Sequence, residues 1–355
     1  MDLPDMVAAL PSAERRLFQG IFHVTSSEGK LRPPQAMHQW IQEYFGPLES
    51  VLHQRVVRIT NLVTMEGALF NGLRSRRPLV IQKREELDGL IAKDVGDPFC
   101  RPLEGTPADV FGRVEGKYSV TASNIAKFDG LHGVVIFGEH DPLNFSEERI
   151  GDYIDTAMAW AQRARATDRD AKYLFFLWNC MWRAGASVVH GHAQVILGRD
   201  MHYAKVEHLR RAALDYRKAV GKDYFTDLYR AHDMLGLALD VNDIRLLLYL
   251  TPIKDKEVLL ISEELDYKLK KSVYQVLECY VKALGVTSFN MVIYMPPLGP
   301  VSEDWSDFPV LVRLVDRGDL MSRTADMCAM ELYASSVISS DPFRVIEVLR
   351  EELLS

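Results

Sequence analysis

The chain has 355 residues and a mass of 40.4 kDa, enough to bury a sizeable core in one large domain or in two smaller ones. Its net charge is -7 and its pI is about 5.8, which argues against a general nucleic-acid binder, because such a protein needs a basic face to neutralise many phosphates. The four cysteines are widely separated and form no Cys-x-x-Cys pair, so we expect no disulfide framework and a reducing compartment.

The N-terminus does not have the pattern of a secretion signal, because acidic and proline residues stand where a basic start and an apolar run are needed. No apolar stretch approaches the roughly 20 residues that a membrane helix requires. We therefore expect a cytoplasmic protein with no membrane and no nucleic acid as partner. Charge and pattern in residues 1–95 suggest helices, with an arginine cluster near the end of this N-terminal segment.

Strand and helix patterns become clear from about residue 115. Runs rich in Val, Ile and aromatic residues predict strands, and Ser146 followed by two glutamates predicts the start of a helix. In chain order we expect two strands, a helix and two strands, at 118–124, 131–138, 146–166, 173–179 and 188–197. The same order recurs at 245–250, 257–262, 263–284, 288–295 and 308–315. Two tandem units of this kind indicate a duplication.

Helices are also expected outside the two copies. A charged helical segment connects them at 201–235, and two closing helices are predicted at 323–336 and 342–354. All ten histidines lie at or before His232, so the second copy contains none. Chemistry that depends on imidazole must therefore take place in the first copy.

The most informative stretch runs from Asn179 to Gly198 and reads NCMWRAGASVVHGHAQVILG. Alternate residues of an extended segment share one face, so His190, His192 and Gln194 would line up on a strand between apolar neighbours. Burying such a row costs free energy unless each side chain finds a partner. The row therefore predicts a functional site, although a His-x-His pair alone also fits a fortuitous metal site or a surface pair.

A wider pattern surrounds this row and consists of Asn179, Gly185, Ser187, His190, His192 and Gln194. Its spacing resembles galactose-1-phosphate uridylyltransferase, a branch of the histidine-triad superfamily whose pattern is Asn, Gly-x-Ser, then His-Pro-His-x-Gln. Gly191 stands in place of the proline. Hydrolases of the branch usually carry a third histidine where Gln194 stands, so the glutamine favours transferase or phosphorylase chemistry.

The resemblance implies an α+β fold of tandem duplicated repeats, each an antiparallel half-barrel sheet with flanking helices. We expect an N-terminal segment, a first repeat with the active site, a helical connector and a second repeat with C-terminal helices, spanning 1–95, 96–200, 201–240 and 241–355. The family works as a dimer, so we also expect a homodimer. In it the second repeat would serve as scaffold or complete the partner's site.

The resemblance assigns the nucleophile to His192, because an imidazole attacks phosphorus and its cationic adduct leaves readily to the next acceptor. Gln194 would bind the phosphate oxygens of the covalent intermediate. Asn179 and Ser187 would place uncharged donors near the same oxygens, and Gly185 would let the backbone approach closely.

A zinc site is also implied. The family commonly supplies two cysteines, a histidine at the end of the second strand and the first histidine of the pair. Here Asp97 replaces the first cysteine, and Cys100, His140 and His190 match the other three, so these four side chains would form one tetrahedral site. Alternatively the metal has been lost, and Cys100 is an ordinary buried thiol. The family's second metal site cannot be carried over, because the second copy lacks histidine.

The remaining binding residues are implied by position. Arg74 and Arg77 match an Arg-x-x-Arg-Pro motif that grips the nucleotide's diphosphate in the family, although an arginine cluster alone is more often a solvated face. Ser123 and Asn124 stand where the family contacts ribose and base, and Glu331 stands where it holds the hexose.

Together these features predict a nucleotidyltransferase that moves a nucleoside monophosphate from a nucleotide sugar of the UDP-hexose type to a sugar 1-phosphate, through a covalent histidine intermediate. One alternative is a phosphorylase or hydrolase of the same superfamily that acts on an adenylyl donor, either an ADP-sugar or a diadenosine polyphosphate. Another is a non-catalytic nucleotide-binding protein. The sequence does not choose between uracil and adenine.

Overall fold

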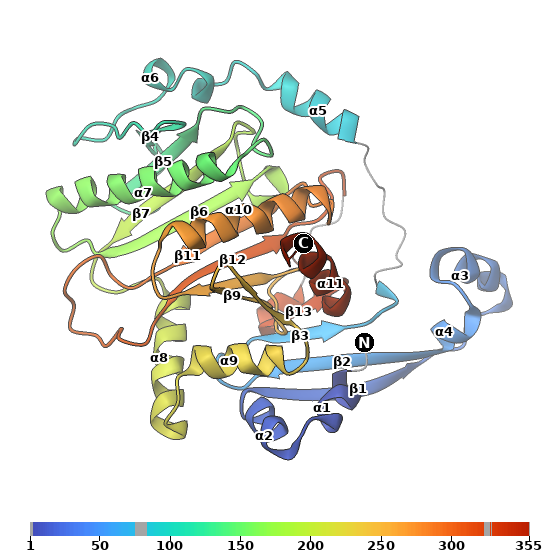
Figure 1. The fold of residues 1–355 in the computed structure, drawn as a ribbon. Coiled ribbons are helices and arrows are strands. Elements are labelled where there is room, and N and C mark those ends of the chain that lie inside the picture. The colour runs from blue at the N-terminus through green and yellow to red at the C-terminus, as the bar shows by residue number, and fades with distance from the viewer. Residues whose placement is uncertain (1–2, 75–83, 323–326, 328, 355) are drawn as a thin grey trace.

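The computed structural model of the protein describes residues 3–74, 84–322, 327 and 329–354. These residues form one four-stranded sheet, one nine-stranded sheet and the helices around them (Figure 1). The fold is therefore α+β, as the sequence predicted. None of the described helices is long and apolar enough to cross a membrane.

The four-stranded sheet is built mainly from the N-terminal segment. Its strands, in spatial order, are β1 (Phe22–Lys30), β2 (His53–Asn61), β3 (Gly67–Phe70) and β13 (Ser335–Ile338). The expectation of helices in residues 1–95 is therefore wrong over β1, β2 and β3, which the sequence did not indicate. Most side chains of β1 are exposed, so this strand lacks the apolar alternation by which a strand is recognised.

Helices occupy much of the rest of the N-terminal segment. They are α1 (Leu3–Ala9), α2 (Ser12–Ile21), α3 (His38–Phe45), α4 (Leu48–Leu52) and α5 (Arg84–Lys93). Figure 1 shows α3 and α4 at the far end of the β1–β2 ladder, away from the larger sheet. A 3-10 turn at Pro98–Cys100 and the short helix α6 (Pro102–Gly105) then lead into that sheet.

The nine-stranded sheet runs through both predicted copies. In spatial order its strands are β4 (Ser119–Ser123), β5 (Leu131–Phe137), β7 (His192–Gly198), β6 (Tyr173–Cys180), β11 (Phe289–Tyr294), β12 (Val310–Asp316), β10 (Val258–Ser262), β9 (Ile244–Leu248) and β8 (Ala238–Val241). All neighbouring strands in it are antiparallel. The order β4-β5-β7-β6 is mirrored by β9-β10-β12-β11, with β6 and β11 paired at the centre. This symmetry agrees with the predicted duplication.

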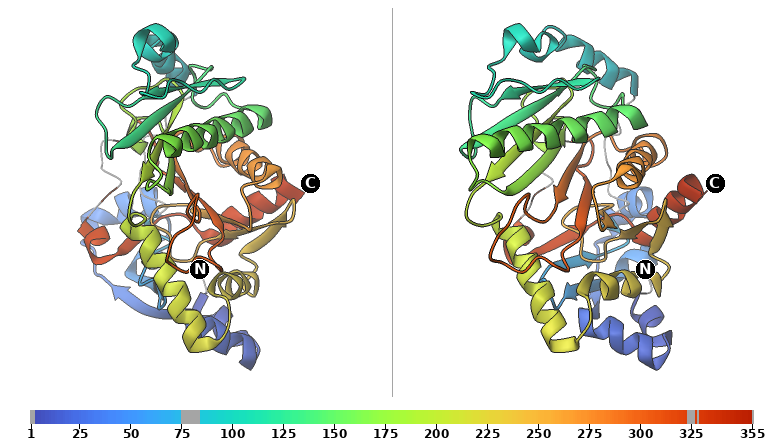
Figure 2. Two further views of the ribbon diagram at one scale, coloured as in Figure 1. Left: turned by 90° about the vertical axis from the view of Figure 1, so that its left-hand side faces the viewer. Right: turned by 60° about the vertical axis from the view of Figure 1, so that its left-hand side comes forward.

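Two long helices lie side by side on one face of this sheet (Figures 1 and 2). They are α7 (Glu147–Thr167), against the first half, and α10 (Tyr267–Lys282), against the second. As predicted, Ser146 caps α7, because its Oγ accepts from the backbone N of Arg149 at 3.4 Å. Neither α7 nor α10 covers the opposite face of the sheet.

The connector and the chain end also contain helices. The predicted connector consists of α8 (Ala204–Val220) and α9 (Tyr224–Asp233), and α11 (Pro342–Leu354) is the second closing helix. The helix predicted at 323–336 is wrong where the chain is described, because a 3-10 turn at Ala329–Tyr333 is followed by β13. That strand pairs in parallel with β3. The rest of this prediction, at 323–326 and 328, lies outside the described residues.

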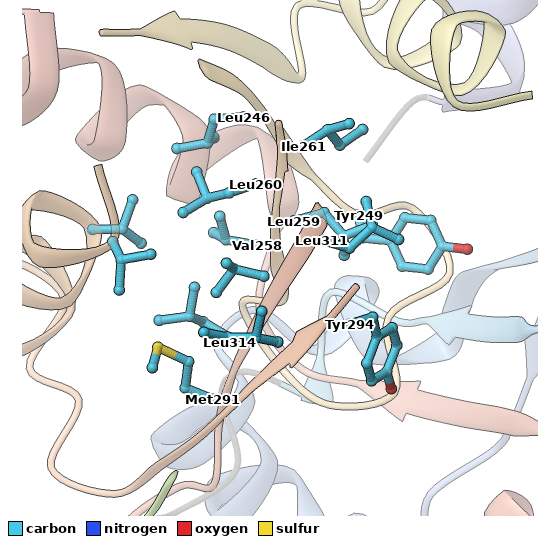
Figure 3. Close-up of a cluster of buried hydrophobic side chains, with 14 of the residues drawn as sticks. Leu246, Tyr249, Val258, Leu259, Leu260, Ile261, Met291, Tyr294, Leu311 and Leu314 are labelled. Atoms are coloured by element: carbon cyan, nitrogen blue, oxygen red, sulfur yellow. The ribbon is translucent and has the colours of Figure 1, made fainter. Parts of the chain in front are cut away.

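The second half of the large sheet carries apolar side chains on both faces (Figure 3). Leu260, Leu314 and Met291 lie on one side of the strands, and Tyr249 and Tyr294 lie on the other. All five are buried. Because this half is covered on both faces, its tyrosine side is not an open surface.

Candidate active site

The strand that carries the site begins later than predicted. β7 starts at His192, so the expectation of a strand over 188–197 is wrong for its first four residues. His190 lies in a bend before the strand, and the three polar residues therefore do not form one row on a strand. His192 and Gln194 do share a face of β7, the one opposite α7.

Gly191 joins the bend to the strand. Its N–H donates to the backbone oxygen of His140 at 3.0 Å, and its carbonyl accepts from the backbone N of Phe137 at 2.9 Å. A Cβ at this position would lie 2.7 Å from Phe137 Cδ2. A proline here would also remove the N–H donor. The local packing therefore explains why this chain has glycine where the resemblance has proline.

His192 is buried, with 7% of its surface exposed. Its Nδ1 lies 2.8 Å from the backbone oxygen of His190 and must donate to it, because a carbonyl only accepts. The neutral ring therefore keeps its lone pair at Nε2. Burial lowers the pKa of His192, although the hydrogen bond to His190 opposes this effect. An unprotonated Nε2 on a neutral imidazole is a competent nucleophile.

A cavity of about 280 Å³ lies in front of this face. His192 and Gln194 line it together with Ser187, Asn124 and Phe99. The structure thus brings four of the predicted site residues around one cavity, with the ring of Phe99 5.1 Å from that of His192. A larger cavity, of about 730 Å³, lies at the edge of the second half, but no histidine lines it.

The four predicted metal ligands converge beside the cavity. The Sγ of Cys100 lies 3.4 Å from His140 Nδ1 and 3.5 Å from His190 Nδ1. Asp97 Oδ2 lies 3.6 Å from His140 Nδ1 and 3.8 Å from His190 Nδ1. One ligand atom from each of the four residues falls within 4.8 Å of the others. The cluster can therefore hold a metal ion.

The hydrogen bonds around the cluster fit a cation at its centre. His140 Nε2 bonds to the Ile91 oxygen at 3.0 Å, and His190 Nε2 bonds to the Phe137 oxygen at 2.9 Å, so both outer nitrogens donate. The two Nδ1 lone pairs then face each other 3.1 Å apart, an arrangement that a bound cation relieves. The buried Asp97 Oδ2 has no hydrogen-bond partner within the described parts of the chain. One sulfur, two nitrogens and one oxygen make a donor set that suits zinc.

His132 is a site residue that the sequence analysis did not identify. It lies on β5, is completely buried, and its Nε2 is 2.8 Å from Gln194 Oε1. The backbone N of Phe128 donates to its other ring nitrogen at 3.0 Å. No local motif marks His132, because its contact with Gln194 depends on the pairing of β5 with β7.

Asn290 is a second site residue without a sequence signal, and it lies in the second half of the sheet. It is paired with Asn179 across the central β6–β11 ladder. Its Nδ2 donates to Asn179 Oδ1 at 2.7 Å. Asn179 lies next to the cavity strand without lining the cavity itself. Gly185 has a left-handed backbone with φ of 97°, which explains glycine there.

Two of the other predicted binding residues, Arg74 and Glu331, are not brought to this cavity. Arg74 follows β3 in the N-terminal segment, and Arg77 lies outside the described residues. Glu331 forms an ion pair with Lys254, at 2.6 Å between Oε1 and Nζ. Neither Arg74 nor Glu331 lines the cavity of His192.

The fold is shared with several solved structures. An ADP-glucose phosphorylase from Arabidopsis thaliana, with bound ADP-glucose, matches with a TM-score of 0.62 at 18% identity, over 82% of this chain and 97% of that one. A GalT-like protein from Arabidopsis thaliana matches with a TM-score of 0.59 at 19% identity, over 74% and 94%. A uridylyltransferase matches with a TM-score of 0.55 at 14% identity, over 83% and 98%. No protein-family model and no curated protein sequence match the chain.

These likenesses confirm the fold that the resemblance implied. The chain shares the α+β fold of the ADP-glucose phosphorylase, the GalT-like protein and the uridylyltransferase, and the mirrored strand order agrees with the predicted duplication. At identities below 20% the comparison shows the fold and leaves the reaction to the chemistry of the site.

Proposed function

We propose that the protein is a nucleotidyltransferase. It moves a nucleoside monophosphate from a nucleotide sugar of the UDP-hexose type to a sugar 1-phosphate by double displacement. The observation that carries this proposal is the ring of His192, which is neutral, holds its proton at Nδ1 through the His190 carbonyl and leaves Nε2 as a nucleophile in a cavity wall. Gln194 beside it and the shared fold support the same chemistry.

The reaction has two displacements at one phosphorus atom. In the first, His192 Nε2 forms a bond to the α-phosphorus while the bond to the bridging oxygen breaks, and the sugar 1-phosphate leaves with the electron pair. In the second, a phosphate oxygen of the acceptor attacks the same phosphorus and the electron pair of the N–P bond returns to Nε2. His192 never has to lose its Nδ1 proton, because the hydrogen bond to the His190 carbonyl stabilises the cationic adduct.

Uncharged donors would bind the phosphate during both steps. Gln194, Ser187 and Asn124 line the same cavity and can donate to phosphate oxygens. Donors placed where charge develops stabilise the transition state more than the substrate. We assign nucleotide binding to these residues, to Asn179 and to the arginines Arg74 and Arg77.

A phosphorylase that uses inorganic phosphate as the acceptor is the second candidate. The pairing of Glu331 with Lys254, away from the cavity, favours it, because the residue expected to hold a hexose is engaged elsewhere in the same chain. In a homodimer Glu331 would have to reach the partner's cavity instead. Sedimentation or light scattering of the purified protein would show whether a dimer exists.

We also propose that zinc occupies the cluster of Asp97, Cys100, His140 and His190. Bound there, the ion would fix the segment that ends in His190, whose carbonyl orients His192. Its role would be structural, since all four ligands come from the protein. Elemental analysis should find about one zinc per chain in the original protein and much less in Cys100→Ser. Equal metal content in both would contradict the assignment.

The central experiment is intact-mass measurement after incubation with UDP-glucose and, separately, with ADP-glucose. We expect one donor to add the mass of its nucleoside monophosphate to the protein, and His192→Ala to abolish this adduct. His23→Ala, which changes an exposed histidine of β1, is the matched control and should keep it. Full activity of His192→Ala would refute the mechanism.

The acceptor is identified with the protein that carries the adduct. Loss of the adduct on addition of a hexose 1-phosphate supports the transferase, and loss only with inorganic phosphate or with water supports a phosphorylase or a hydrolase. Binding of nucleotide without any adduct would leave a non-catalytic nucleotide-binding protein.

A further inference from the structure

Two side-chain amides near His192 have their oxygens engaged by other side chains. An amide of this kind offers an acceptor oxygen on one side and two N–H donors on the other. Phosphate oxygens accept hydrogen bonds, so only the NH₂ side can bind them. Gln194 and Asn179 can therefore bind phosphate only if a neighbouring donor hydrogen-bonds their side-chain oxygens and leaves their NH₂ groups free.

The oxygen of Gln194 is held by His132. Because the backbone N of Phe128 donates to His132 Nδ1 at 3.0 Å, the neutral ring carries its proton on Nε2. That Nε2 lies 2.8 Å from Gln194 Oε1 and donates to it. The Nδ2 of Asn124, 3.2 Å from the same Nε2, is itself a donor group and cannot accept this proton. Burial lowers the pKa of His132, which keeps the ring neutral.

The oxygen of Asn179 is held by Asn290. The guanidinium of Arg317 donates to Asn290 Oδ1, which turns the Nδ2 of Asn290 the other way. That Nδ2 donates to Asn179 Oδ1 at 2.7 Å and to the backbone oxygen of Ala184 at 2.9 Å. A cation at the oxygen and two acceptors at the nitrogen permit only one orientation of Asn290. Asn179 is left to offer its NH₂ group.

We propose that His132 and Asn290 are positioning residues that hold Gln194 and Asn179 with their NH₂ groups available to the phosphate of the nucleotide. The inference rests on the proposed function, because it requires a phosphate beside His192. Neither positioning residue touches the reacting atoms. His132 acts across the β5–β7 pairing, and Asn290 acts across the centre of the sheet, so the second half contributes to the site without a histidine.

A pair of variants of similar length tests His132. His132→Gln keeps an N–H donor near the position of Nε2, and His132→Met has none. We expect His132→Met to weaken the binding of UMP or AMP, titrated separately by calorimetry, by about tenfold, the value of one hydrogen bond to a charged group. His132→Gln should restore most of it. Equal losses in the two variants would overturn the role of His132.

A double variant separates positioning from general damage. In a Gln194→Ala background, His132→Met should cause no further loss of affinity, because its effect passes through Gln194. An additional tenfold loss in that background would show that His132 acts by another route and would overturn the proposal.

The tautomer of His132 gives a test that does not depend on turnover. In protein with isotopically labelled histidine, NMR of the ring nitrogens should show a neutral His132 with its proton on Nε2, the signal being assigned by its loss in His132→Gln. A proton on Nδ1, or on both nitrogens at neutral pH, would overturn the proposed positioning of Gln194 by His132. If the original protein forms no nucleotidyl adduct while this tautomer is found, the proposed reaction fails, but the positioning of Gln194 by His132 is still supported.

Asn290→Asp tests the positioning of Asn179 by Asn290. The aspartate keeps the contact with Arg317, but its second oxygen accepts a hydrogen bond where Asn290 donated one. Asn179 must therefore turn its NH₂ group toward this aspartate, which leaves the Asn179 oxygen facing the phosphate. We expect affinity for UMP or AMP to fall by about tenfold or more. The same change in an Asn179→Ala background should have no effect.

Asn290→Leu removes the donor without adding charge and serves if Asn290→Asp does not fold. Unchanged nucleotide affinity in a folded variant of either kind would overturn the role of Asn290.

Discussion

The two halves of the nine-stranded sheet place different side chains at matching positions. Leu177 on β6 pairs with Gln194 on β7 and with Val292 on β11. Val292 in turn pairs with Arg313 on β12. Gln194 and Arg313 therefore lie in one row on the same face of the sheet, equally far from its centre. Gln194 lines an open cavity, and Arg313 is buried among carboxylates.

The surroundings of Arg313 explain the difference. Its Nε donates to Glu257 Oε1 at 2.6 Å, and its guanidinium reaches Glu66 Oε1 at 3.3 Å. Lys205 from α8 lies 2.8 Å from the same oxygen of Glu66. Glu66 comes from the turn between β2 and β3, so the N-terminal segment covers the second half. In the first half, where this face of the sheet borders a cavity, the row provides a candidate ligand site. In the second half, where the N-terminal segment covers the face, the same row provides a buried ion-pair tie of Arg313 with Glu66 and Glu257.

The largest effect is expected from removing the tie. Arg313→Met leaves Glu66 and Glu257 buried without their shared cation, and breaking a buried ion pair by removing one partner costs about 3–5 kcal/mol. Urea unfolding should show this loss in the free energy of unfolding.

The matched change in the first half is Gln194→Leu. It should cost only about 1–2 kcal/mol, because a single neutral donor, that of the buried His132, loses its acceptor. Similar losses of stability at the two positions would break the comparison.

Acid should loosen the same tie. Burial alone would raise the pKa of Glu66, but the charges of Arg313 and Lys205 lower it to about 2 from an ordinary 4.5. The stability that this carboxylate contributes is therefore present above about pH 4.5 and is lost as the pH falls toward 2.

Glu66→Gln removes this contribution at every pH. At neutral pH the variant should be less stable by about 3 kcal/mol, and its difference from the original protein should shrink toward zero near pH 2. Urea unfolding at several pH values measures both chains. A difference that stays constant across this range would show that the tie is not ionic.

A comparably small effect is expected at Gly191 in the first half, where the packing leaves no room for a side chain. In Gly191→Ala the new Cβ would meet Phe137 at 2.7 Å, and the adjustment should cost about 1–3 kcal/mol and lower the zinc content, because Gly191 adjoins His190. Gly151→Ala is the control, since nothing lies within 4 Å of a Cβ there and alanine favours the helix. If both variants are equally stable and hold equal zinc, the bend tolerates a side chain.

Much of the large sheet was predictable because its physical signals are local. Apolar runs marked β5 and β6, and Ser146 marked the start of α7 through its capping hydroxyl. The N-terminal sheet was not, because β1 is largely exposed and β13 is held by a partner strand more than half the chain away. Strands of this kind owe their form to pairing rather than to their own pattern.

The candidate site divides in the same way. The resemblance carried by the pattern from Asn179 to Gln194 implied an imidazole nucleophile, and the same resemblance implied that Asp97, Cys100 and two histidines would meet, as they do. The contacts of His132 and Asn290 could not be predicted from the sequence, because they join residues that only the register of the paired strands brings together. Arg74 was assigned by motif, and its place after β3 does not bring it into the cavity lining.

The strand β13 has a consequence for how the protein is made. Strands β1, β2 and β3 are translated long before β13, so β3 gains its outer neighbour only when residues 335–338 have been made. During most of synthesis β3 therefore offers a free strand edge to other chains. A premature stop before that point would leave this edge without its neighbour, so residues 335–338 protect β3 from pairing with other chains.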